Sequence, residues 1–110
     1  MTERIQAQEL YRQISVDHNL HIIDVRDQNL FALGHVPGAL NNPHLRLRAA
    51  PNFVPDDHPV ILYDEDDHSE AFDIEETARL LEDRGHRVHI LSGGLAAWLQ
   101  ADLPIEKETQ

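Results

Sequence analysis

The chain has 110 residues, of which 41% are hydrophobic, and it carries a formal net charge of −11 and no cysteine. This size and composition indicate one globular domain and exclude a disordered chain or a chain held together by disulfides. No apolar run approaches the ~20 residues that cross a bilayer, and the polar start of the chain is unlike a signal peptide. We therefore expect a cytoplasmic protein that binds neither membranes nor nucleic acid, which its negative charge would repel.

The first third of the chain alternates helical and extended patterns. Ala7 to Ile14 places apolar side chains at helical spacing, and His21 to Val25 is an apolar run typical of a buried strand. Asp27 to Leu33 fits a short helix, and Gly34 suits its end. These patterns predict a helix, a strand and a second helix.

The middle of the chain contains shorter elements. Val36 to Ala39 includes Pro and Gly and predicts a turn that leads into a short extended piece. Leu45 to Ala49 fits a short helix, which Pro51 stops. Val60 to Tyr63 is entirely apolar and predicts the next buried strand.

The last third begins with a helix signal. Asp73, with Glu76 three residues later, has the pattern of a capping box, and Gly85 suits the end of that helix. Val88 to Leu91 predicts a further strand, and Leu95 to Leu99 predicts a final helix. Such alternation indicates an α/β fold with a mostly parallel sheet covered on both faces.

The loop after the strand that ends at Tyr63 is strongly acidic. Residues 64 to 76 hold eight of the twenty acidic residues of the chain and no Lys or Arg. Ligands of α/β proteins bind at the carboxyl ends of strands, so this loop is the candidate functional site. Its residues are Asp64, Glu65, Asp66, Asp67, His68, Ser69 and Glu70.

Three segments together resemble the rhodanese family. They are IIDVRDQNLFALGHVPGALNNP (Ile22 to Pro43), VILY (Val60 to Tyr63) with the loop and helix that follow, and GHRVHILSGGLAAWLQADLP (Gly85 to Pro104). Their order and spacing match the family. The resemblance implies a five-stranded parallel sheet flanked by helices on both faces. It also implies a single domain over residues 1–110, with a core from about 5 to 105 and a short polar tail.

The resemblance also implies where function would lie. In active members a cysteine follows the strand corresponding to Val60–Tyr63 and carries sulfur as a persulfide, and amides of the next loop bind the anion. Here Asp64 stands at that position, as it does in the inactive domains of tandem sulfurtransferases. A carboxylate cannot form a persulfide. We therefore expect an inactive sulfurtransferase homologue with no catalytic residue, no cofactor and no metal.

Electrostatics gives a second argument against anion binding. The family's loop carries an arginine near its end, where this chain has Ser69 and Glu70. Two like charges ~6 Å apart repel by roughly 1–3 kcal/mol. Several such repulsions exceed the ~0.3–1 kcal/mol attraction of a helix dipole, so we expect the loop to reject a thiosulfate or phosphate dianion.

Charged residues outside the loop have structural interpretations. Asp24 and Arg26 end a strand at the same edge, and we expect them to support the loop, with Arg26 pairing with a loop carboxylate such as Asp64. Arg46 and Arg48 are expected to lie in solvent. The eight histidines are scattered without a ligand spacing, so we expect no metal-binding role for them.

Two enzyme hypotheses stay open. One is a sulfurtransferase that borrows a cysteine from a partner. The other follows from VILYDEDD, which resembles the strand end of haloacid-dehalogenase-type phosphatases, with Asp64 as nucleophile, Asp66 as acid/base and Mg²⁺ between them. That superfamily also needs a later lysine, and the only lysine here is Lys107 in the tail.

The favoured function is therefore not enzymatic. We expect recognition or regulation of a partner protein through the acidic loop, with a basic patch on the partner as the electrostatic complement. The sequence leaves the oligomeric state open.

Overall fold

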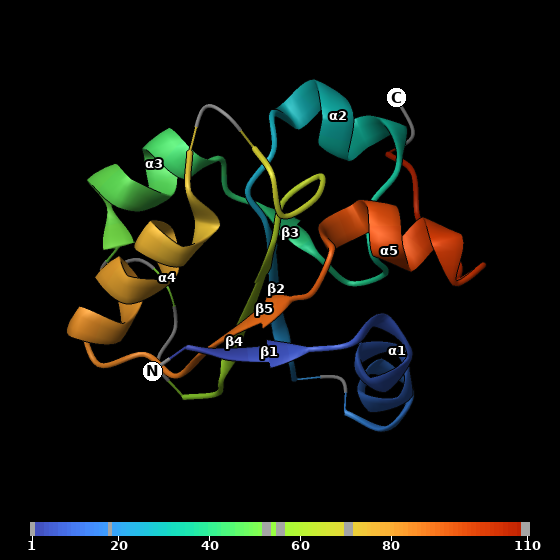
Figure 1. Cartoon of the computed structure of the whole chain (residues 1–110), viewed down its shortest axis with the longest axis horizontal. Coiled ribbons are helices and arrows are strands. Elements are labelled where there is room, and N and C mark those ends of the chain that lie inside the picture. The colour runs from blue at the N-terminus through green and yellow to red at the C-terminus, as the bar shows by residue number, and fades with distance from the viewer. Residues whose placement is uncertain (1, 18, 52–53, 55–56, 70–71, 109–110) are drawn as a thin grey trace.

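Strands and helices alternate along the chain in the computed structural model, which describes residues 2–17, 19–51, 54, 57–69 and 72–108. The strands are β1 (Glu3–Ile5), β2 (His21–Asp24), β3 (Leu40–Asn41), β4 (Val60–Tyr63) and β5 (Val88–Leu91). The helices are α1 (Ala7–Val16), α2 (Gln28–Leu33), α3 (His44–Ala49), α4 (Ile74–Asp83) and α5 (Gly94–Gln100). Figure 1 shows the sheet between α3 and α4 on one side and α1 and α5 on the other.

The five strands form one parallel sheet in the order β1-β5-β4-β2-β3. Strand β4 lies between β2 and β5, and Asp24 at the end of β2 pairs with Tyr63 at the end of β4. Because parallel strands end at the same edge of a sheet, the residues that follow Asp24 and Tyr63 leave the sheet side by side. The candidate loop begins at this edge.

Strand β4 is the centre of the core. Ile61 and Tyr63 point into a cluster with side chains of α1, α2 and α5, whereas Val60 and Leu62 point into a second cluster with side chains of α3 and α4. All four are buried because helices cover both faces of the sheet, which is why the strand is a continuous apolar run. The predicted α/β fold, a five-stranded parallel sheet with helices on both faces, is confirmed.

Strand β1 is the element that the residue pattern did not predict. It has three residues, pairs only with β5 at the edge of the sheet, and buries only Ile5. A polar strand of this length has no alternation long enough to detect, so its existence followed from the family resemblance alone.

The remaining elements differ from expectation mainly at their ends. Helix α1 continues to Val16, and β2 ends at Asp24, one residue earlier than expected. Asp73 caps α4 as predicted, but its side chain accepts the amide of Glu75, and Glu76 pairs with Arg48 at 3.7 Å and does not complete a capping box. Across the described residues, no helix is long and apolar enough to span a membrane.

Candidate functional site

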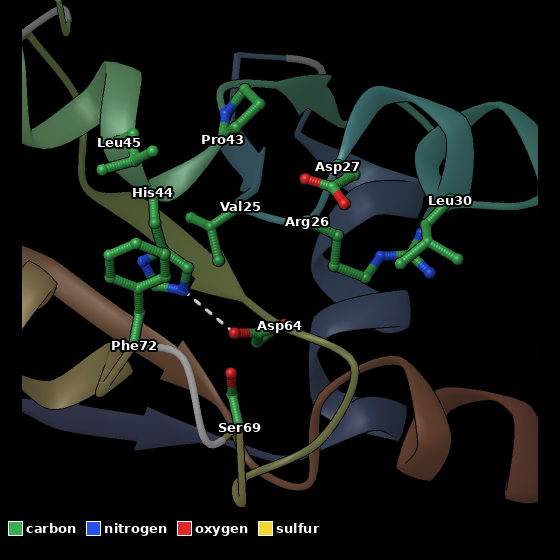
Figure 2. A pocket seen from close by; sticks show the side chains of 10 residues that line it. All are labelled: Val25, Arg26, Asp27, Leu30, Pro43, His44, Leu45, Asp64, Ser69 and Phe72. Carbon is green, nitrogen blue, oxygen red and sulfur yellow. Dashed lines mark hydrogen bonds and ion pairs between the residues drawn. The ribbon is translucent and has the colours of Figure 1, made fainter.

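A pocket of about 210 Å³ opens at the edge of the sheet where β2 and β4 end. Figure 2 shows its lining, to which α2, α3 and the loop after β4 contribute. Asp64 lies in this pocket and is only 7% exposed. The lining residues are Val25, Arg26, Asp27, Leu30, Pro43, His44, Leu45, Asp64, Ser69 and Phe72.

The Asp64 carboxylate is held by two hydrogen bonds. Its Oδ1 accepts the amide of Glu65 at 2.7 Å, and its Oδ2 lies 2.9 Å from Nε2 of His44, the contact drawn in Figure 2. Burial acts to raise the pKa of Asp64, but the hydrogen bonds from His44 and Glu65 and the nearby charge of Arg26 outweigh it and hold this pKa below its ordinary value. Asp64 is therefore an anion at neutral pH.

His44 connects Asp64 to helix α4. Its Nδ1 lies 3.0 Å from the hydroxyl of Thr77, and that hydroxyl accepts a hydrogen bond from Nε of Arg48 at 3.0 Å. His44 and Thr77 are both buried, and the ring of His44 stacks on Phe72 with centroids 4.9 Å apart. The pair of His44 and Asp64 is thus fixed from α3 and α4 at once.

Both ring nitrogens of His44 are engaged, Nδ1 with the hydroxyl of Thr77 and Nε2 with the carboxylate of Asp64. Because His44 is buried, both nitrogens need such partners in place of water.

Arg26 supports the loop from β2. Its guanidinium bonds both carboxylate oxygens of Asp24, with the shortest contact 2.8 Å, and also the carbonyl of Gly34 at 2.6 Å. Its Nη1 donates to Glu65 at 3.0 Å. Burial alone would lower the pKa of Arg26, but Asp24 and Glu65 raise it above its ordinary value. The expected pair between Arg26 and a loop carboxylate is present, with Glu65 as the partner and not Asp64.

The loop is also fixed against the start of α5. The carbonyls of Asp64 and Glu65 accept the amides of Leu95 and Ala96 at 3.0 and 2.9 Å. Gly94 lies so close to the loop that a Cβ placed there would overlap the carbonyl oxygen of Asp64. The loop therefore lies on the glycine turn that begins α5, where its carbonyls satisfy the free amides of that helix.

The acidic side chains of the loop accept hydrogen bonds from nearby amides and from arginines that lie far away in the sequence. Asp66 accepts the amide of His68 at 2.7 Å, and Asp67 accepts the amide of Gly93 at 3.0 Å. Arg4 of β1 bonds Asp67 at 3.2 Å and Glu75 at 2.7 Å. The loop is therefore less negative in its surroundings than its own sequence indicates, because Arg4 of β1 and Arg26 just after β2 bring positive charges to it.

Two side chains of α3 differ from expectation. The sequence pattern gives His44 no special role, yet it holds Asp64 of the loop. We expect Arg48 in solvent, yet it bonds Thr77 and Asp73 beside α4 and lies over the ring of Phe72. Of these two residues, only His44 could have been connected with the site from the sequence, because it directly follows the rhodanese-like segment that ends at Pro43. Glu70 of the candidate loop lies outside the described residues.

The phosphatase hypothesis required Asp64 and Asp66 to share a metal ion. In the structure they bond different groups, His44 for Asp64 and the amide of His68 for Asp66. Within the described part of the chain, no three His, Asp or Glu side chains come together in an arrangement that could hold a metal ion.

Comparison with known proteins agrees with the fold. The model of the rhodanese-like domain family matches residues 6–101. A protein named sulfurtransferase from Allochromatium vinosum is 28% identical over 105 residues, which cover 96% of this chain and 95% of that protein. The solution structure of a rhodanese-like domain from Anabaena sp. is 27% identical, with a TM-score of 0.79 over 98% of this chain and 81% of that one. A rhodanese-like domain protein from Staphylococcus aureus is 21% identical, with a TM-score of 0.80 over 98% of this chain and all of that chain (100%). The chain belongs to the rhodanese-like domain family.

Proposed function

We propose that this chain is a rhodanese-like module that does not transfer sulfur itself and that recognises or regulates a partner protein through its acidic loop. The proposal is supported mainly by the position of Asp64 and by its contacts. Asp64 directly follows β4, where the resemblance to active members implies a cysteine, and its carboxylate is bonded to His44 and to the amide of Glu65.

The chemistry of sulfur transfer supports this proposal. A persulfide forms when a thiolate attacks a sulfur donor, and the whole chain contains no cysteine. The amides of Glu65 and His68, which a bound anion would need, are already bonded to the carboxylates of Asp64 and Asp66. An incoming dianion would have to displace these carboxylates and would then be repelled by them.

The partner is inferred from charge. The side chains of Glu65 and Asp67 are 50% and 32% exposed, so they remain accessible although each has a cationic neighbour. With a net charge of −11 on the chain, a partner with a basic surface would be steered toward this face. The cytoplasm remains our expectation for where this occurs.

The proposal is tested by two measurements on the full chain. Metal-free protein is assayed for sulfur transfer from thiosulfate and 3-mercaptopyruvate to cyanide, and for hydrolysis of phosphate esters with and without Mg²⁺, beside an active sulfurtransferase. We expect no turnover above buffer in any of these assays. Sulfur transfer at the rate of the active enzyme would overturn the proposal.

The second measurement is affinity capture from the native cell at about 50 and 500 mM salt. We expect a basic protein that is retained at low salt and released at high salt, because exposed charge pairs are screened. A double variant, Glu65→Gln with Asp67→Asn, should lose this capture. If the captured protein restores thiosulfate turnover through its own cysteine, the borrowed-cysteine hypothesis replaces ours.

A further inference from the structure

We propose that the pocket beside Asp64 binds one lysine side chain that the partner protein presents. This inference rests on the proposed function and names the chemical group by which the partner is recognised.

The size of the pocket selects a single side chain. Its volume of about 210 Å³ lies below the roughly 300 Å³ at which pockets for drug-sized ligands begin. Apolar side chains from several elements line it, among them Leu30 of α2, Leu45 of α3 and Phe72. Leu30 and Leu45 are 42% and 70% exposed, so their apolar surface is open to an alkyl stem.

The charge around the pocket selects a cation. Asp64 contributes one carboxylate to the lining. Asp27 is exposed and adds a second carboxylate to the lining. The one guanidinium in the lining, that of Arg26, is already bonded to Asp24 and Glu65. The lining thus holds two carboxylates and one guanidinium that is already paired with carboxylates outside the lining.

The hydrogen-bonding capacity of Asp64 selects an ammonium group. A carboxylate can accept about four hydrogen bonds, and within the described part of the chain Asp64 has two such partners, Glu65 and His44, one on each oxygen. Figure 2 shows the Ser69 hydroxyl oriented toward Asp64, where it offers another acceptor. A compact ammonium with three donors fits separate acceptors, whereas an arginine fork requires both carboxylate oxygens free in one plane.

The inference is tested by NMR titration of the full chain with two short peptides. Acetyl-Gly-Lys-Gly-amide carries the ammonium, and acetyl-Gly-norleucine-Gly-amide has a similar alkyl stem without charge. We expect the lysine peptide to shift the resonances of Leu30, Leu45 and Ser69 and to bind about tenfold more tightly than the norleucine peptide. Equal binding of the two peptides, or no binding of either, would overturn the inference.

Matched variants locate the charge that is responsible. Asp64→Asn and Asp27→Asn should each weaken the lysine peptide at least about threefold, and Asp102→Asn, which removes an equal charge from an exposed position past the end of α5, should not. Should Asp64→Asn fail to fold, Asp27→Asn decides alone. Unchanged affinity in the pocket variants, or preference for thiosulfate over the lysine peptide, contradicts the inference. The sulfur-transfer assay on the same sample is an independent test. If the protein neither transfers sulfur nor binds the lysine peptide, this inference is disproved but the proposed function is not.

Discussion

Among single residues, Asp64 has the largest influence on the candidate site. The carboxylate occupies a loop amide and binds His44, and both contacts stabilise its charged form. A buried carboxylate is stable only when its hydrogen-bond partners outweigh the loss of water. The side chains of α3 and α4 that hold His44 are therefore as much a part of the site as Asp64 itself.

Asp64 should make the stability of the fold depend on acid. Because its pKa is lowered in the folded state, the unfolded chain binds a proton more readily, and the contribution of Asp64 is complete above the ordinary aspartate pKa of about 4 and is lost as the pH falls through the lower folded value. We expect the wild type to exceed Asp64→Asn by about 1–3 kcal/mol in free energy of unfolding at pH 7, and by clearly less at pH 3. Urea unfolding at both pH values measures this difference. A difference that grows with acid would show that the sign is wrong.

Thr77 offers a test of the hydrogen-bond chain. Thr77→Val keeps the shape of the side chain but leaves Nδ1 of His44 and Nε of Arg48 without their common partner, so we expect a loss of about 1–3 kcal/mol in free energy of unfolding. Thr77→Ser keeps the hydroxyl and serves as the control. Equal free energies of unfolding for the valine and serine variants in chemical denaturation would mean that these hydrogen bonds contribute little to the stability of the fold.

At the scale of elements, the site depends on how the loop after β4 meets other segments. Arg26 from the end of β2 holds Glu65, α5 binds two loop carbonyls, and Arg4 of β1 reaches Asp67. The short edge strand β1 therefore positions a cation for the loop in addition to closing the sheet. These contacts join segments up to 63 residues apart in the chain.

Because α5 lies so close to the loop, we expect a methyl group added at Gly94 to lower the stability of the fold strongly. At Gly94, φ is +60° and a Cβ would also lie 2.9 Å from the amide nitrogen of Asp66. Gly38 has a similar positive φ of +81° but open space around it. Both alanine variants carry the ~1–2 kcal/mol cost of the left-handed backbone, and Gly94→Ala adds about 1–3 kcal/mol for the overlap. Thermal unfolding of the two variants compares them, and equal losses would refute the close contact.

For the whole molecule, the sequence predicts the layers of helices and sheet but does not predict the side-chain contacts between them. Apolar runs such as Val60–Tyr63 and Val88–Leu91 predicted strands with the observed bounds, because strands buried on both faces leave an unmistakable pattern. The position of Asp64 after β4 followed from the resemblance. The pairing of His44 with Asp64 depends on the crossing of α3 past the end of β4, which no local pattern encodes. The charge of the acidic segment likewise cannot be judged from its own residues, because arginines from other elements pair with it.

We propose that this scaffold lacks the reactive atom of a sulfurtransferase and carries carboxylates around Asp64 instead. The decisive variant is Asp64→Cys, because it introduces a thiol after β4 but leaves Glu65, Asp66 and Asp67 in place. Two or three repulsions of about 1–3 kcal/mol each should keep the rate of thiosulfate turnover more than about 100-fold below that of an active sulfurtransferase. Adding Glu65→Gln, Asp66→Asn and Asp67→Asn to Asp64→Cys should raise this rate at least about tenfold. Turnover by Asp64→Cys alone at the rate of the active enzyme would show that these carboxylates do not prevent sulfur transfer.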